Sequence, residues 1–199
     1  MLYLKQTDIE VRQSGIERQM DALPCVKNLL LTGRPGSGKT TIVSRAIEGA
    51  ASAGGFFTGE VRENGVRTGF SIRTLDGRSG TLASVGTRSP VKVSRYGVNL
   101  HDVDEVAAAS VERAVRDDAA DLVVIDEIGA MEIASERFRA AVREALDCPK
   151  RVLGTIQMKE NQFLDLVRAR QDVHVERVDS STREVLPGLV RDWLDLRPG

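Results

Sequence analysis

The chain has 199 residues, of which 41% are hydrophobic and 29% charged, with a formal net charge of -1. These values fit one globular domain, and the near-neutral charge does not favour a nucleic-acid partner. The sequence has no apolar run near the roughly 20 residues of a membrane span, no secretory leader and no disulfide framework, so we expect a cytoplasmic protein, without a membrane partner and monomeric.

The first part of the chain predicts a short arm followed by a strand, a glycine-rich loop and a helix. Residues 1–24 are polar and read as an N-terminal arm, and residues 25–199 as a single domain. A buried strand is expected over 26–32. A helix is expected from Lys39 to Ala53, closed by Gly54-Gly55.

Short alternating segments follow, punctuated by Asn64-Gly65 and Asp76-Gly77, which are typical of hairpin turns. They predict strands near 57–62, 67–74 and 79–84. The next helix is expected over 102–116, with Asp102 as its N-cap.

The second half alternates apolar strands with amphipathic helices. Strands are expected at 122–125, 152–156 and 173–178, and helices at 135–146, 160–170 and 186–196. This alternation predicts an α/β domain with a mainly parallel sheet, to which the hairpin region adds an antiparallel extension.

One segment matches the phosphate-binding pattern G-x-x-x-x-G-K-[ST] without a mismatch. Glycines let backbone N–H groups approach phosphates, and the positive end of the following helix points at the same place. The lysine reaches the terminal phosphates, and the threonine hydroxyl is a ligand for Mg²⁺. The predicted nucleotide-binding residues are Gly33, Arg34, Pro35, Gly36, Ser37, Gly38, Lys39, Thr40 and Thr41.

A second signal is the apolar run 122–125, which ends in Asp126-Glu127. An acid at the end of a buried strand beside a phosphate loop is typical of the carboxylate that holds Mg²⁺. The next carboxylate can orient and polarise an attacking water. We therefore predict Thr40 and Asp126 as magnesium-binding residues, and Glu127 and Lys39 as catalytic ones.

Several linked blocks resemble the thermophile-type nucleoside triphosphatase family, called cancer-related nucleoside triphosphatase in animals. The resemblance spans about 27–189. Its blocks are 31–41, 55–63 with 65–70, 124–132 and 153–156. The chain departs from the family pattern at Ala130, at Val93-Ser94-Arg95-Tyr96 and at Thr182-Arg183.

The resemblance implies a RecA-like P-loop fold in three layers, in which strand 152–156 lies between the phosphate-loop strand and strand 122–125. It also implies slow, Mg²⁺-dependent hydrolysis of several nucleoside triphosphates, ATP and GTP among them, to diphosphate and phosphate. Gln157, which follows that middle strand, is either a sensor of the terminal phosphate or an ordinary polar loop residue.

Other polar residues have two interpretations each. Thr58, Glu60 and Arg62 share one face of a predicted strand, which is either a substrate face, with Glu60 as a base and Arg62 as a phosphate clamp, or a solvated charge pattern. Arg168 or Arg170 is either an arginine finger or a partner of the helix dipole. Glu132 either hydrogen-bonds near the site or caps the next helix.

The favoured function is nucleoside-triphosphate hydrolysis. The sequence has no Asn-Lys-x-Asp motif for reading guanine, which favours broad base use. A nucleotide or small-molecule kinase with the same core is the alternative, in which the hairpin face would hold a phosphoryl acceptor. A nucleotide-switched binding module is a third possibility, which the near-neutral charge does not favour.

Overall fold

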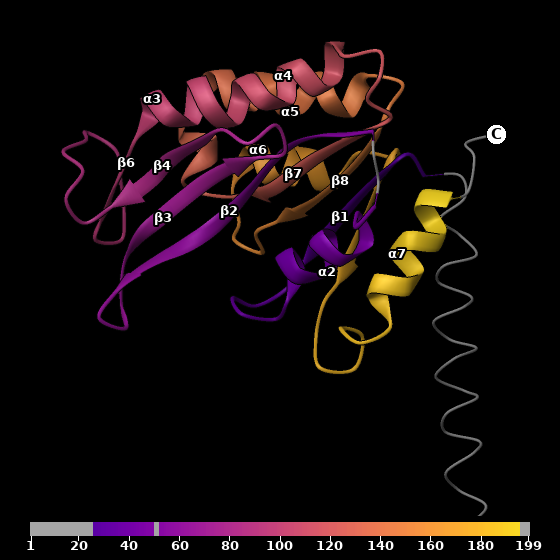
Figure 1. Cartoon of the computed structure of the whole chain (residues 1–199), viewed down its shortest axis with the longest axis horizontal. Coiled ribbons are helices and arrows are strands. Elements are labelled where there is room, and N and C mark those ends of the chain that lie inside the picture. The colour runs from indigo at the N-terminus through magenta and orange to yellow at the C-terminus, as the bar shows by residue number, and fades with distance from the viewer. Residues whose placement is uncertain (1–25, 50–51, 196–199) are drawn as a thin grey trace, which may run out of the picture.

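The computed structural model describes residues 26–49 and 52–195, so the arm predicted over 1–24 lies outside the described residues. Within them, nine strands form one sheet in the order β5-β6-β4-β3-β2-β7-β8-β1-β9 (Figure 1). The strands are β1 (Asn28–Thr32), β2 (Ala53–Glu63), β3 (Val66–Thr74), β4 (Ser79–Ser84), β5 (Lys92–Val93), β6 (Tyr96–Val98), β7 (Leu122–Ile128), β8 (Arg151–Ile156) and β9 (Val173–Arg177).

The five strands from β2 to β9 in that order are parallel, and β3, β4, β6 and β5 continue the sheet with antiparallel pairs. Most residues of β1, β7 and β8 are apolar and buried, as expected of strands covered on both faces. The predicted mixed sheet is confirmed, and β8 lies between β1 and β7 as expected. The short strands β5 and β6 were not predicted.

Helices cover both faces of the sheet and make three layers. The helical segments are α2 (Lys39–Ala46), α3 (Leu100–Asp102), the π-helix η2 (Val103–Ala108), α4 (Ala109–Arg116), the 3₁₀-helix η3 (Glu132–Ala134), α5 (Glu136–Asp147), α6 (Gln162–Arg168) and α7 (Leu186–Asp195). Figure 1 shows α2 and α7 on one face and α4, α5 and α6 on the other. None of the helices in this part of the chain is long and apolar enough to cross a membrane.

Each face of the sheet has its own apolar core. On the α4–α5 side, Phe56 of β2 packs edge-on against Phe138 of α5, with ring centroids 5.9 Å apart. On the other side, Trp193 of α7 is buried with Val43 of α2. The two cores hold the strand ends, and hence the loops that follow them, in fixed positions.

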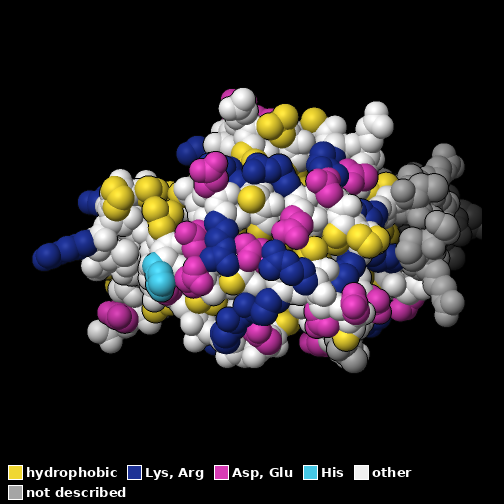
Figure 2. Space-filling model, turned by 90° about the horizontal axis from the view of Figure 1, so that it is seen from above, with side chains coloured by type: hydrophobic (Ala, Val, Ile, Leu, Met, Phe, Trp, Pro, Cys, Tyr) yellow, Lys and Arg dark blue, Asp and Glu magenta, His cyan; other side chains and the backbone are white. Residues whose placement is uncertain are grey.

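The outer surface of α4 and α5 carries charges of both signs close together (Figure 2). Arg137 of α5 pairs with Glu112 of α4 at 2.8 Å and with Glu105 of η2 at 2.6 Å. On this face, basic side chains therefore lie among acidic ones and form no patch of one sign.

The β2–β3 hairpin has the predicted turn. Asn64 and Gly65 both have positive φ, 49° and 79°, which is why this pair is favoured in a two-residue hairpin turn. The hairpin strands pair from Phe56–Thr74 to Glu63–Val66, with a bulge at Val61/Arg62. This register places one face of β2 and β3 beside the phosphate loop.

Two predicted boundaries were wrong. Gly54-Gly55 does not close the first helix, which ends at Ala46, but lies within β2. A methyl group at Gly55 would lie 2.0 Å from the carbonyl oxygen of Val124, so β2 needs glycine where it approaches β7. Asp102 is not a helix cap, because the side chain of Asn99 accepts the amide of Asp102. The Asp102 carboxylate instead accepts the amide of Thr81 at 2.7 Å.

Candidate active site

The phosphate loop joins β1 to α2 and has the backbone that its glycines predict. Gly36 and Gly38 have φ of 76° and 97°, a region that other residues rarely adopt. A methyl group at Gly33 would lie 2.5 Å from the carbonyl oxygen of Val178. Gly38 is the N-cap of α2 and has no side chain that could accept a hydrogen bond from the first amides of the helix. The first turn of α2 also has no acidic residue. These amides are therefore available to bind an anion.

A cavity of about 650 Å³ lies over this loop, a size that suits a ligand as large as a nucleotide. Four parts of the chain line it: the phosphate loop with the start of α2, the β2–β3 hairpin, the end of β7 and the end of β8. The lining residues are Gly33, Pro35, Gly36, Gly38, Lys39, Thr40, Thr41, Thr58, Gly59, Glu60, Arg67, Phe70, Glu127, Thr155 and Gln157. Among the predicted residues of the loop, Arg34 and Ser37 are not part of the lining.

Lys39 lies against the loop that precedes it. Its Nζ donates to the carbonyl oxygens of Gly33 at 3.2 Å and Arg34 at 3.4 Å. The ammonium group therefore sits inside the curve of the loop, where the open amides also point. This brings a full positive charge and several partial ones to one wall of the cavity.

Asp126 is buried behind the cavity, with 1% of its surface exposed. Its Oδ1 accepts from the hydroxyl of Thr155 at 2.8 Å, whereas Oδ2 is buried and has no hydrogen bond within the described residues. Burial raises the pKa of this carboxyl, and the hydroxyls of Thr155 and Thr40 and the charge of Lys39 lower it. A buried carboxylate oxygen without a partner, beside a threonine hydroxyl, suits a divalent cation with oxygen ligands.

Glu127 follows Asp126 and lines the cavity; the peptide bond between them is cis. Burial raises the pKa of Glu127, while the charge of Lys39 lowers it and that of Asp126 raises it. A hydrogen bond with Gln157 also lowers this pKa. Gln157 is itself fixed, because its Oε1 accepts the amide of Ala130 at 3.0 Å. Glu127, Gln157 and Lys39 therefore line one cavity, and the charge of Lys39 acts on the Glu127 carboxylate.

The comparisons with known proteins agree with this geometry. A family model described as NTPase matches residues 28–190. The chain belongs to this nucleoside-triphosphatase family. It is 42% identical to "Nucleoside-triphosphatase THEP1" of Thermotoga sp. (strain RQ2) over 158 residues, 79% of this chain and 90% of that one. It is 38% identical to the mouse "Cancer-related nucleoside-triphosphatase homolog" over 180 residues, 82% of this chain and 95% of that one.

Two solved structures of this nucleoside-triphosphatase family share the fold. The crystal structure of THEP1 from Aquifex aeolicus aligns with a TM-score of 0.73 and 33% identity, covering 81% of this chain and 95% of the other. The solution structure of a human cancer-related nucleoside triphosphatase aligns with a TM-score of 0.71 and 34% identity, covering 86% and 100%. The predicted P-loop fold and the family resemblance are confirmed, and the chain is a member of a family of hydrolases.

The structure brings two of the three residues predicted to share one face of the hairpin strand to the cavity. Thr58 and Glu60 line the cavity, whereas Arg62 does not. Glu60 is bound by two arginines, Arg67 at 2.5 Å and Arg62 at 2.6 Å, which hold its pKa below the ordinary value. A carboxylate with a lowered pKa is a weak proton acceptor, so the geometry does not support Glu60 as a general base. Arg62 donates to Glu60 and to the carbonyl oxygen of Gly65, outside the cavity.

Neither arginine near the end of α6 lines the cavity. Arg170 donates to Asp172, which also accepts from Asn28, the first residue of β1. Arg170 therefore lies at the opposite end of β1 from the phosphate loop, which contradicts the arginine finger as one of its two interpretations. Arg168 pairs with Asp165 at 2.7 Å and donates to the backbone carbonyl of Gln157. It supports the segment that carries Gln157.

Glu132 is buried beneath the loop after β7, with 3% of its surface exposed. Burial, followed by the charge of Glu127, raises its pKa to about 8. A methyl group at Gly129 would lie 2.6 Å from Nε2 of Gln157 and 3.0 Å from a carboxyl oxygen of Glu132. Glu132 therefore packs beside the Gln157–Glu127 pair. The cap of α5 is a different residue, Ser135, whose side chain accepts the amide of Phe138.

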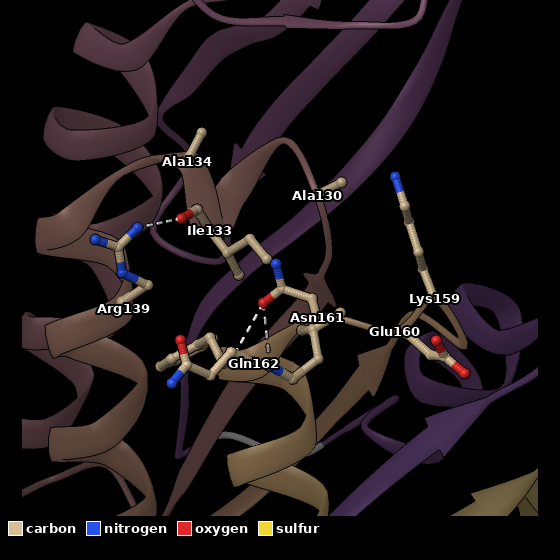
Figure 3. A pocket seen from close by; sticks show the side chains of 10 residues that line it. Ala130, Ile133, Ala134, Arg139, Lys159, Glu160, Asn161 and Gln162 are labelled. Atoms are coloured by element: carbon tan, nitrogen blue, oxygen red, sulfur yellow. Dashed lines mark hydrogen bonds between the residues drawn. The ribbon is translucent and has the colours of Figure 1, made fainter.

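A second cavity of about 460 Å³ opens between η3, α5 and the start of α6 (Figure 3). Its residues are Ala130, Ile133, Ala134, Arg139, Lys159, Glu160, Asn161, Gln162, Phe163 and Leu164. Figure 3 shows Asn161 turned to the start of α6, where it caps the helix, and Arg139 bonded to the carbonyl of Ile133. No residue of the phosphate loop lines this cavity, so the first cavity is the candidate active site.

Proposed function

We propose that the protein hydrolyses nucleoside triphosphates, ATP and GTP among them, to diphosphate and phosphate, with Mg²⁺ and with little selectivity for the base. The observation that carries this proposal is the position of Glu127. Glu127 lines the same cavity as Lys39 and the phosphate loop, and Gln157 lines it too. A carboxylate that borders a phosphate site supports water as the attacking group.

The chain binds the triphosphate through its loop. The open amides at the start of α2 and the Lys39 ammonium stabilise the negative charge of the phosphates. Lys39 exchanges the carbonyls of Gly33 and Arg34 for phosphate oxygens. Because these groups are fixed before binding, the charge that develops on the terminal phosphate meets dipoles that do not need to reorganise.

Glu127 acts on the water. Its carboxylate accepts a hydrogen bond from a water O–H and draws the proton as the water oxygen forms a bond to the terminal phosphorus. The bond that breaks joins this phosphorus to the bridging oxygen of the leaving diphosphate. Gln157 borders the cavity beside this carboxylate, and its own side chain is fixed by the amide of Ala130.

Thr40 and Asp126 would hold Mg²⁺, because the Asp126 carboxylate has a buried oxygen without a hydrogen bond in the described part of the chain. The ion supplies charge neutralisation on the phosphates when bound. Chelating divalent cations with EDTA should lower phosphate release by about 100-fold, and excess Mg²⁺ should restore it. Phosphate release measured in both conditions checks this, and equal rates with and without chelator would contradict it.

Replacing Lys39 with alanine should lower kcat/KM for phosphate release by about 10²–10³-fold, because one preorganised positive group is lost from the phosphate site. Steady-state kinetics with ATP measure this. Lys92→Ala removes an exposed lysine on β5 and serves as the control. If the Lys39→Ala protein keeps more than half of the wild-type kcat/KM, Lys39 does not act in the phosphate site.

The function itself is tested by following the terminal phosphate. Radiolabelled ATP, GTP, CTP and UTP are each incubated with the protein and Mg²⁺, alone and with a panel of nucleosides and nucleoside monophosphates. Free phosphate at similar rates from all four, unaffected by the panel, supports the proposal. Label that passes to a member of the panel faster than to water would instead support a kinase.

A further inference from the structure

Among the arginines of residues 26–49 and 52–195, Arg67 of β3 is the one that lines the first cavity. Two of its three nitrogens are occupied: Nε donates to the hydroxyl of Tyr96 at 3.2 Å, and Nη1 to Oε1 of Glu60 at 2.5 Å. Nη2 makes no hydrogen bond with any residue of 26–49 or 52–195. The guanidinium group therefore keeps free N–H donors while it borders the phosphate site.

Two aromatic rings lie beside this guanidinium group. Its central carbon lies 5.2 Å from the ring centroid of Phe70 and 5.9 Å from that of Tyr96. These two rings pack edge-on at 5.2 Å, and Tyr96 is buried. An arginine stacked in this way loses little further freedom when it binds an anion through its edge.

The charge around Arg67 is not cancelled. Glu60 is shared between Arg67 and Arg62, and its two oxygens each pair with a different guanidinium. Arg95 adds a third positive charge, since it stacks on Tyr96 at 5.2 Å and donates to the backbone carbonyl of Arg67. One carboxylate among three guanidinium groups leaves the surroundings of Arg67 positive, which favours a polyphosphate in the cavity that Arg67 lines.

We propose that Arg67 binds the polyphosphate of the substrate through Nη2. Its guanidinium group also stabilises the negative charge that develops as the terminal phosphoryl group is transferred. Glu60 and Tyr96 are positioning residues that act through Arg67. This inference rests on the proposed function. It assigns to the hairpin the role that the sequence had suggested for Arg168 or Arg170, neither of which lines the cavity.

The first test compares Arg67→Ala with Arg73→Ala. Both changes remove an arginine from β3, but Arg73 is exposed and does not line the cavity. For Arg67→Ala we expect kcat to fall by about 10²-fold, since an arginine supplied to a transferring phosphoryl group has an effect of this order or larger. The Kd for Mg²⁺-ATP should change by less than about tenfold, and Arg73→Ala should match the wild type.

Two further measurements distinguish a role of Arg67 in phosphoryl transfer from a purely structural one. Added guanidinium chloride at millimolar concentration should restore part of the kcat of Arg67→Ala and leave Arg73→Ala unchanged. Arg67→Lys keeps a charge but loses the planar fork, and its kcat should lie between those of wild type and Arg67→Ala. Circular dichroism melting checks that each variant is folded; if Arg67→Ala is not, Arg67→Lys and Arg67→Gln take its place.

The positioning role of Glu60 is tested by non-additivity. Glu60→Gln alone should lower kcat by less than Arg67→Ala. The double variant should be no slower than Arg67→Ala, because Glu60 acts only through the guanidinium group. Additive losses would overturn this part of the proposal.

The outcomes distinguish this inference from the proposed function. If the wild-type protein releases no phosphate from any nucleoside triphosphate, the proposed function fails. If the wild type hydrolyses ATP and Arg67→Ala keeps kcat within twofold, without any response to guanidinium, hydrolysis stands and the role of Arg67 is overturned.

Discussion

A Glu127→Gln protein should bind Mg²⁺-ATP with a Kd close to that of the wild type and release phosphate on the order of 10³-fold more slowly. The amide keeps the size and shape of the side chain, but it cannot take a proton from water. Lys39, the phosphate loop and Asp126 are unchanged, so binding of the triphosphate is preserved. Single-turnover phosphate release and equilibrium binding of a fluorescent nucleotide measure the two quantities separately.

Glu63→Gln is the matched control for this change, because Glu63 is an exposed glutamate at the end of β2 that does not line the cavity. Its kcat should equal that of the wild type. A Glu127→Gln protein with a kcat within threefold of the wild type would exclude Glu127 as the group that activates water. A large rise in Kd would instead place Glu127 in substrate binding.

Glu132→Gln should make the protein more stable at pH 8, and the gain should disappear towards pH 4.5. The folded-state pKa of Glu132 is about 8, against an ordinary value of 4.5. Between these values the folded chain holds a proton that the unfolded chain has released, so wild-type stability falls as pH rises. The slope is about 1.4 kcal/mol per pH unit, which amounts to as much as about 5 kcal/mol over the whole interval. Glutamine carries no titrating proton and removes this loss.

Urea unfolding at pH 5, 6.5 and 8 measures the difference, with the protein free of nucleotide and metal. Glu63→Gln again serves as the control, and its stability should follow the wild-type curve. If the curves of wild type and Glu132→Gln run parallel across this interval, Glu132 is not held protonated by its surroundings. A neutral Glu132 also adds no negative charge to that of Asp126 beside Glu127 near neutral pH.

Local chemistry made much of the site predictable. The phosphate loop needs glycine at Gly36 and Gly38 and a lysine directly after them, so its pattern is readable from eight residues. Asp126-Glu127 is readable because a wholly apolar strand precedes it. Asn64-Gly65 fixed the hairpin turn, since few other pairs adopt two positive φ values.

Other features depend on contacts between distant segments. Gly54-Gly55 has the composition of a helix stop, but the close approach of Val124 decides its place in β2. The sequence predicted Asp102 as the helix cap in place of Asn99, because both residue types cap helices. The two are distinguished only in the fold, where the Asp102 carboxylate accepts the amide of Thr81 and Asn99 accepts the amide of Asp102. Arg67 was missed as a cavity residue because its position depends on Tyr96, 29 residues later. Its place in the family block 65–70 was the available signal.

The position of β8 between β1 and β7 sets a length scale for the chemistry. Neighbouring strands lie about 4.8 Å apart, so two spacings put roughly 10 Å between the backbone that leads into the phosphate loop and the backbone that carries Asp126. A metal ion with its oxygen ligands and a phosphate group fit that width. A methyl group at Gly154 of β8 would lie 2.4 Å from the carbonyl of Ile125. This glycine therefore lets β8 lie close to β7. A bulkier residue there would widen the distance between the phosphate loop and Asp126 that the bound substrate and metal ion span.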